Sequence, residues 1–262
     1  MHDSAKEYLK KFNSFYLLGK NNLKILDLGS FDVNGSAKDI FKDTHNYMGM
    51  DIVAGKNVDI VMEDPYKIPL EDASIDVVLS TSCFEHSEMF WLVFNEILRV
   101  LKPNGLFYLN APSNGPYHLH PVDCYRFYPD SGNALIRWAN YSGYQNSILL
   151  ESFIGKKKND VWNDYVAIFL KDKKFLNDYE NRIIEVNKHI EKEIKDFDIN
   201  LYNNVSFYNG KVYGSQKIYN HITKTEDQFF RQIKYRSKKI YNFYKVINKL
   251  FNLIKLKKKI KV

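Results

Sequence analysis

The chain has 262 residues, of which 45% are hydrophobic and 26% are charged, as expected for one globular α/β domain with an appended segment. It has no apolar run of about 18 residues, the length of a membrane-spanning helix, and no signal-peptide core near Met1, so a cytoplasmic location is expected. The two cysteines, Cys83 and Cys124, are too few for a disulfide framework and are expected to be free thiols.

The formal net charge of +7 is concentrated at one end of the chain. Residues 231–262 hold 12 of the 38 basic side chains and none of the 31 acidic ones, so residues 1–230 have a net charge of −5. Nucleic acid is not expected as a partner, because the lysines of the tail come with no recognisable binding module.

The first elements predict a nucleotide-type site. Residues 3–19 predict an amphipathic helix, capped by Asp3 or Ser4 and packed over the cofactor site or the sheet edge. The stretch 23–36, LKILDLGSFDVNGS, predicts a buried parallel strand that ends in a ligand-facing turn. In that turn Gly29 permits close backbone approach, and Gly35 is suited to a positive φ.

Two observations extend this interpretation. Ser36 is expected to cap a helix through SAKDIFKDT. A second apolar segment ends at Asp51, 24 residues after Asp27, where an open α/β sheet places the carboxylate that accepts both ribose hydroxyls. Each aspartate taken alone is equally consistent with a solvated turn residue.

Further strands and helices alternate along the chain. Ser80, Thr81 and Ser82 follow the predicted fourth strand, and Ser87 is expected to cap the next helix, which Lys102–Gly105 ends. Strands are predicted at 58–62, 75–79, 106–112, 147–153 and 164–172, and helices at 87–101 and 134–142. This alternation is typical of a doubly wound α/β sheet.

Five segments carry a family resemblance: ILDLG, MGMDI, MEDPYKIPL, IDVVLSTSCFEH and EILRVLKPNGLFYLNAP. In order and spacing they resemble the class I S-adenosylmethionine-dependent methyltransferases over residues 20–172. The resemblance implies a seven-stranded, mixed, Rossmann-like sheet, S-adenosylmethionine as the cofactor, a methyltransferase domain at 1–172 and a mainly helical, basic extension at 173–262.

The resemblance also implies roles for residues at the cofactor. Asp27 would hold the methionine end, Asp51 the ribose, and Asp64 the adenine amine. The full implied set is Asp27, Gly29, Ser30, Gly35, Asp51, Ile52, Asp64 and Ser80.

One departure points to a subgroup. Phe31 and Val33 replace two glycines of the usual turn, which disfavours a dinucleotide dehydrogenase, whose turn needs G-x-G-x-x-G. The form GSFDVNG, together with HLHPVDCYRFYPD, is similar to bacterial methyltransferases of surface-polysaccharide and nucleotide-sugar pathways. It implies methyl transfer to oxygen on a nucleotide-linked sugar or on a capsule or lipopolysaccharide precursor.

Methyl transfer to an alcohol requires removal of a proton, for which a positioned base contributes on the order of 10²–10⁴ in rate. His120 is the first choice for the base and His86 the second, with Asp123 or Glu85 orienting it. Each histidine is also consistent with a hydrogen bond to the backbone.

Three residues are candidates for binding the acceptor: His118, Arg126 and Tyr125. Arg126 could hold a phosphate or carboxylate, or form a loop-fixing ion pair with Asp123. Tyr125 could line the pocket or pack the loop. No metal is expected, because the acidic and histidine residues of this region lack a tight ligand spacing.

The extension leaves several interpretations open. A helix is predicted over 175–194 and an irregular or hairpin connection around Asn209-Gly210. Isoleucine recurs every seven residues from Ile233 to Ile254, which is consistent with packing or homodimerisation, a coiled coil, or a helix on an anionic membrane surface. Methylation of nitrogen or of a phosphorus-linked oxygen, and a non-catalytic binding module, remain as alternatives to sugar O-methylation.

Overall fold

The computed structural model describes residues 1–119, 121–157, 162–183, 197–199, 206–208 and 211–213. The chain divides into two compact units, Met1–Gly214 and Ser215–Val262. The second unit, which contains the isoleucine repeat and its predicted dimer or membrane contacts, lies outside the described residues.

A mixed β-sheet forms the centre of the first unit, with its strands in the order β3-β2-β1-β4-β5-β7-β6-β8. β1 to β5 are mutually parallel, and β7 is inserted antiparallel between β5 and β6. The strands are β1 (Lys24–Leu28), β2 (Asn46–Asp51), β3 (Ile60–Val61), β4 (Ile75–Thr81), β5 (Leu101–Pro112), β6 (Ile148–Lys157), β7 (Asn163–Leu170) and β8 (Phe197–Ile199). The predicted seven-stranded mixed sheet is confirmed, and β8 adds a short edge strand antiparallel to β6.

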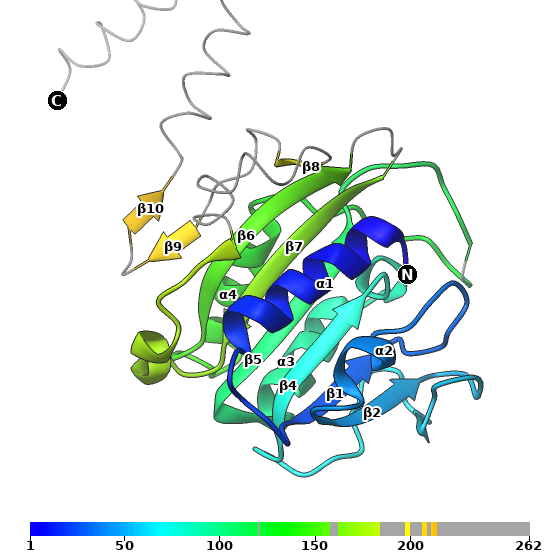
Figure 1. Cartoon of the computed structure of the whole chain (residues 1–262), viewed down its shortest axis with the longest axis horizontal. Coiled ribbons are helices and arrows are strands. Elements are labelled where there is room, and N and C mark those ends of the chain that lie inside the picture. Colours follow the sequence, from blue (N-terminus) through cyan, green and yellow to red (C-terminus); the bar gives the residue numbers. More distant parts are fainter. Residues whose placement is uncertain (120, 158–161, 184–196, 200–205, 209–210, 214–262) are drawn as a thin grey trace, which may run out of the picture. The chain divides into compact units, whose positions relative to one another are not determined.

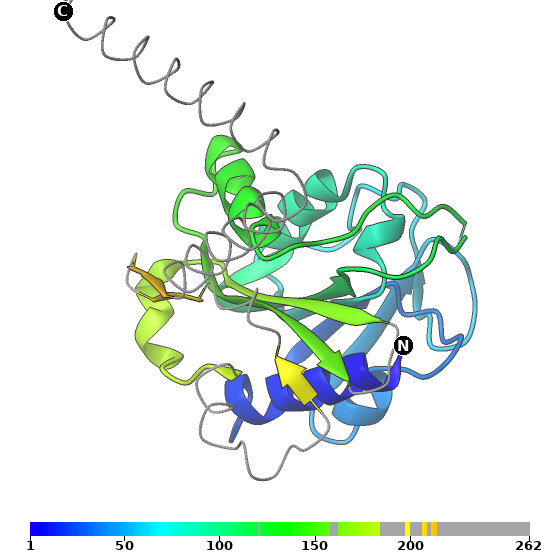
Figure 2. The same ribbon diagram turned by 90° about the horizontal axis from the view of Figure 1, so that it is seen from above.

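Helices cover both faces of the sheet. The helices are α1 (Asp3–Tyr16), α2 (Lys38–Phe41), α3 (Phe90–Val100) and α4 (Ser131–Tyr141), with short 3₁₀ turns at η1 (Phe84–His86) and η2 (Lys173–Asp178). α1 and α2 lie on one face and α3 and α4 on the other (Figures 1 and 2). Among the described residues, no helix is long and apolar enough to cross a membrane.

Each face of the sheet has its own apolar core. Phe94 of α3 packs with Phe107 and Phe169, their ring centroids 5.1 to 5.9 Å apart. On the opposite face Phe12 of α1 packs 5.0 Å from the ring of Tyr108. Because side chains alternate along a strand, neighbouring residues of β5 serve opposite cores, which explains why the strand reads as a continuous apolar run.

Several predicted boundaries differ from the structure. α1 ends at Tyr16, before Gly19. Ser87 does not cap α3, because its amide donates to the Phe84 carbonyl and closes η1, so α3 begins only at Phe90. The segment Lys102–Gly105 does not stand between a helix and a strand, since β5 already begins at Leu101.

The helix predicted after Ser36 is a single turn, Lys38–Phe41, and the Ser36 hydroxyl accepts the Lys38 amide at 3.1 Å. Residues just beyond Leu170 remain packed on the sheet, where Tyr179 and Ile183 are buried. The α-helix predicted from residue 175 is wrong for the residues described, because the 3₁₀ turn η2 runs to Asp178 and residues 179–182 are irregular. The part predicted over 184–194 lies outside the described residues. The predicted hairpin is confirmed, because β9 (Ser206–Tyr208) pairs antiparallel with β10 (Lys211–Tyr213).

Candidate functional site

The carboxyl group of Asp27 is buried near the end of β1, with 5% of the residue exposed. It shares a strand face with Ile25, on the side that α1 covers, and accepts a hydrogen bond of 2.5 Å from the Tyr47 hydroxyl. Burial raises the pKa of Asp27 to about 7, although the bond from Tyr47 acts in the opposite direction. Asp27 is therefore a buried acid rather than a solvated turn residue.

The turn after β1 needs its glycines. Gly29 has a φ of +81°, and a Cβ at this position would lie 2.6 Å from the Cβ of Cys83, in the loop after β4. Gly35 has a φ of +118°, and its amide donates to the Asp32 carboxylate at 2.7 Å. These positive φ values explain the glycines, and the first one also permits close packing of two loops at the same edge of the sheet.

Asp51 ends β2 beside this turn. One carboxylate oxygen accepts the Phe31 amide at 3.1 Å, and the other accepts the Val53 amide at 3.2 Å. A carboxylate has about four acceptor positions, so Asp51 can also accept the two hydroxyls of a ribose. The apolar side chains of Phe31, Ile52 and Val53 are exposed next to it, which suits a flat base.

The other residues predicted at the cofactor have different surroundings. The Ser30 hydroxyl donates to the Asn57 carbonyl at 3.1 Å and supports the loop between β2 and β3. Asp64 is exposed in a turn, where it accepts the Tyr66 amide at 2.8 Å. Ser80 is fully buried in β4, where its side chain acts on the thiol of Cys83.

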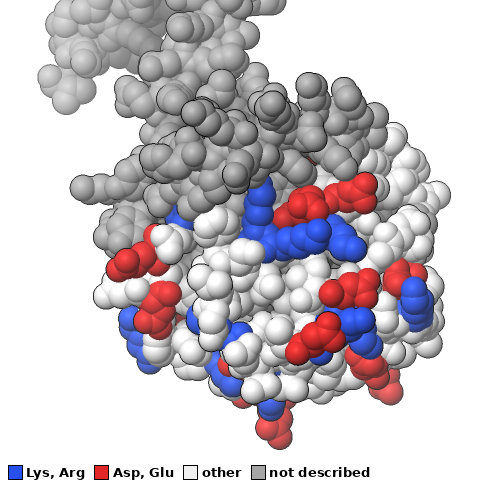
Figure 3. Space-filling model, in the orientation of Figure 1, with Lys and Arg blue, Asp and Glu red and all other residues white. Residues whose placement is uncertain are grey.

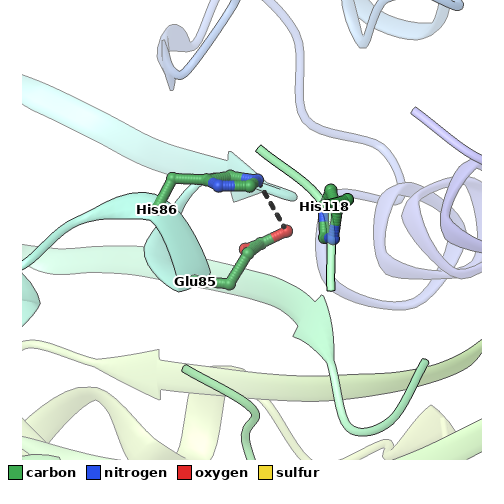
Figure 4. A group of neighbouring side chains, drawn as sticks. All are labelled: Glu85, His86 and His118. Atoms are coloured by element: carbon green, nitrogen blue, oxygen red, sulfur yellow. Dashed lines mark ion pairs between the residues drawn. The ribbon is translucent and has the colours of Figure 1, made fainter. Parts of the chain in front are cut away.

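Beyond Cys83, the chain enters η1 and places Glu85 and His86 at the carboxyl end of β4. Glu85 is only 1% exposed, and burial raises its pKa to about 8. One of its carboxyl oxygens lies 3.7 Å from Nε2 of His86 (Figure 4). Nδ1 of His86 contacts the Val122 carbonyl. The Glu85 carbonyl accepts the Cys124 amide at 2.8 Å and so ties η1 to the loop after β5.

That loop brings His118 to Glu85 and His86. The His118 ring lies edge-on to the His86 ring, with centroids 5.0 Å apart, and 5.2 Å from the ring of Trp162. We call Glu85, His86 and His118 the His–Glu cluster. Its side chains come from two segments more than thirty residues apart and point toward one another (Figure 4).

Asp123 and Arg126 hold the loop in place. The Arg126 guanidinium donates to both Asp123 oxygens, at 2.5 and 2.8 Å, and to the Pro116 carbonyl at 2.9 Å. This fork holds the pKa of Asp123 well below its usual range. Asp123 in turn accepts the His118 amide at 2.8 Å and lies 3.2 Å from its Nδ1. The geometry therefore favours the loop-fixing ion pair, with His118 as the side chain that Asp123 orients.

Two predicted residues need separate mention. His120, the first choice for the base, lies outside the described residues, so its role stays a prediction. The Tyr125 hydroxyl donates to the Glu88 carbonyl at 2.8 Å, and its ring packs 5.0 Å from that of Phe90. These contacts favour the loop-packing interpretation of Tyr125.

The structure adds three residues that the sequence did not single out: Tyr47 on Asp27, Cys83 on Gly29 and Trp162 on His118. Tyr47 had a usable signal, because β1 and β2 were both predicted and pair in parallel.

The face in Figure 3 shows Lys and Arg interspersed with Asp and Glu, unlike the basic surfaces that bind a phosphate backbone.

One family model and several solved structures are similar to this chain. The family described as Methyltransferase domain (Methyltransf_11) matches residues 26–109. The fold is similar to a Burkholderia thailandensis 1,6-didemethyltoxoflavin-N1-methyltransferase solved with S-adenosylhomocysteine, with 17% identity, a TM-score of 0.48, and coverage of 64% of this chain and 78% of that one. It is also similar to the YcgJ protein of Bacillus subtilis, with 13% identity, a TM-score of 0.48, and coverage of 64% and 97%.

No curated protein matches the sequence. The segment matched by the family runs from β1 into β5 and contains Asp27, Gly29 and Asp51 as well as Glu85 and His86. The match over residues 26–109 thus identifies this part of the chain as similar to a methyltransferase domain and indicates S-adenosylmethionine as the cofactor.

Proposed function

We propose that the protein transfers the methyl group of S-adenosylmethionine to a hydroxyl oxygen of a small carbohydrate-type acceptor, such as a nucleotide-linked sugar or a capsule or lipopolysaccharide precursor. The observation that carries this proposal is the His–Glu cluster. It lies directly after Cys83, whose side chain packs on Gly29 of the turn after β1, so polar groups suited to a hydroxyl adjoin the expected cofactor turn.

The residues at the ends of β1 and β2 fit the cofactor. Asp27 offers a buried carboxyl to the ammonium of the methionine end, and Asp51 offers acceptor positions to the ribose hydroxyls. Exposed apolar side chains at Phe31 and Ile52 would flank the adenine. When bound, S-adenosylmethionine supplies an electrophilic methyl group on a positively charged sulfur.

The acceptor side supports oxygen over nitrogen. A neutral amine reacts through a lone pair that is already available, whereas a hydroxyl must be oriented and must lose its proton. Two histidines and a buried glutamate at one point suit the second task. His120, two residues after His118 in the sequence, remains our proposed base.

The loop after β5 supports a carbohydrate. Its rings at Tyr117 and Tyr128 are 72% and 58% exposed, and exposed aromatic rings give the apolar face of a sugar a surface on which to pack. The similarity of HLHPVDCYRFYPD to methyltransferases of nucleotide-sugar pathways points in the same direction.

The test is product analysis. The purified protein is incubated with S-adenosylmethionine carrying a ¹³C-labelled methyl group and with a panel of nucleotide sugars and phosphorylated metabolites. The expected result is a methyl ether on a sugar hydroxyl, recognised by the gain of one methyl group in mass spectrometry and by the methyl carbon shift in NMR. Asp51→Asn serves as the cofactor-deficient control. A product methylated on nitrogen, with the sugars untouched, would overturn the proposal.

A further inference from the structure

The His–Glu cluster brings together three side chains of the kinds that bind transition metals. One ligand atom from each of Glu85, His86 and His118 lies within 4.8 Å of the corresponding atoms of the other two. Two imidazoles and one carboxylate are the donor set of many catalytic zinc sites and of the facial triads that bind iron. Sequence spacing did not reveal the set, because His118 comes from a different loop.

The distances are close to those of a bound ion. Ligand atoms at about 2.1 Å from one tetrahedral ion lie about 3.4 Å from one another. The Glu85 oxygen and Nε2 of His86 are 3.7 Å apart. Small side-chain rotations would therefore bring the donors to bonding distance.

Both histidines are oriented in the way that metal ligands usually are. The Nδ1 atom of His86 contacts the Val122 carbonyl, and Nδ1 of His118 lies 3.2 Å from the Asp123 carboxylate. An imidazole that donates from one nitrogen to an oxygen presents a lone pair at the other nitrogen, and such oxygen partners are the common outer contacts of metal-bound histidine. Arg126 fixes Asp123 in turn.

Glu85 gives a second, independent observation. It is 1% exposed, and its Oε2 atom has no hydrogen-bond partner among the described residues. A buried carboxylate is costly unless it is paired with a cation or fully hydrogen-bonded. The Arg126 guanidinium does not fill this role by hydrogen bonding, since its donors go to Asp123 and to backbone carbonyls.

From this geometry we infer that Glu85, His86 and His118 bind one divalent transition-metal ion of the zinc class, with a coordination position left for the hydroxyl oxygen of the acceptor. The binding of the ion does not depend on the proposed function; only the open position for the acceptor hydroxyl rests on it. A metal bound by three protein side chains keeps an open position, and an oxygen bound there loses its proton more readily. His86 would then act as a ligand, which leaves the base to another residue.

The test uses the full chain without an affinity tag, first treated with a chelator and then titrated with Zn²⁺ by calorimetry and with Co²⁺ by visible absorption. We expect one ion per chain and the visible bands of a cobalt ion with nitrogen ligands. Glu85→Gln and His118→Ala are each expected to weaken binding by ~10-fold or more, the loss that even an outer contact of a metal site produces. The control His45→Gln, at a histidine outside the cluster, should bind as the native protein does.

Circular dichroism and the affinity for S-adenosylhomocysteine show whether each variant is folded. Equal Zn²⁺ affinity in the native protein and in both folded cluster variants would overturn the inference, as would the absence of binding to the native protein. Methyl transfer to a sugar by chelator-treated protein would remove the ion from the reaction and leave the proposed function intact. Binding of one ion per chain together with methylation of nitrogen alone would overturn the proposed function and leave the metal site intact.

Discussion

The burial of Asp27 predicts a stability that depends on pH in an unusual direction. The pKa of this carboxyl is about 7 in the folded protein, against 3.8 for an exposed aspartate. Between these values the folded protein retains a proton that the unfolded chain has lost, so this group makes the free energy of unfolding fall as pH rises from 4 to 7. Each pKa unit corresponds to about 1.4 kcal/mol, so the full penalty above pH 7 is about 4 kcal/mol.

Asp27→Asn removes this titration and keeps an oxygen that can accept the hydrogen bond of Tyr47. In urea unfolding without cofactor, the variant should be the more stable by only about 1 kcal/mol at pH 4.5. At pH 8 the variant should be the more stable by up to about 4 kcal/mol. Calorimetry should nevertheless show weaker binding of S-adenosylmethionine, because the variant has lost the carboxylate.

Asp39→Asn, at an exposed carboxyl of α2, is the matched control and should follow the native curve. A difference between native protein and Asp27→Asn that stays constant from pH 4.5 to 8 would refute the reasoning, since an aspartate with an ordinary pKa would then occupy the site.

Three further predictions concern the turn after β1 and the loops after β4 and β5. Gly29→Ala should lower the free energy of unfolding by roughly 3 kcal/mol, because the new Cβ combines backbone strain with a clash against Cys83; Gly19→Ala, with a φ of +74° and open space around it, should show the strain alone. Burial raises the pKa of the Cys83 thiol to about 12, so a maleimide at pH 7.5 should label the exposed Cys124 first. Rapid labelling that persists in Cys124→Ser would contradict this prediction. His120→Ala should lose turnover and keep its affinity for the cofactor, whereas an unchanged rate would exclude it as the base.

The cofactor edge was readable from the sequence because its signals are local. The apolar run into Gly29 defines a buried strand and its turn within a few residues, and the next apolar segment ends at Asp51. Parallel strands bring their carboxyl ends to one edge, so order along the chain was enough to place these residues together. The alternation of strands and helices predicted a doubly wound sheet, and the family resemblance implied its seven strands and mixed character; the strand order and the antiparallel placement of β7 came from the structure.

Predictions at helix starts were less reliable, because several local hydrogen bonds compete there. Ser87 has the side chain of a helix cap, but its backbone amide is used to close η1. The sequence offers both solutions, and the packing of Phe84 in the core selects one of them.

The sequence by itself determined the fold class and placed Asp27, Gly29 and Asp51 at the ends of neighbouring strands, since strands, turns and their spacing are encoded within short segments. Only the tertiary structure decided which polar groups lie together beyond β4 and β5. It joined His118 to Glu85 and His86, and it paired Arg126 with Asp123. Such contacts depend on how a long loop folds back over the sheet, and the energy that directs it comes from burial and charge pairing between distant residues, which no local pattern records.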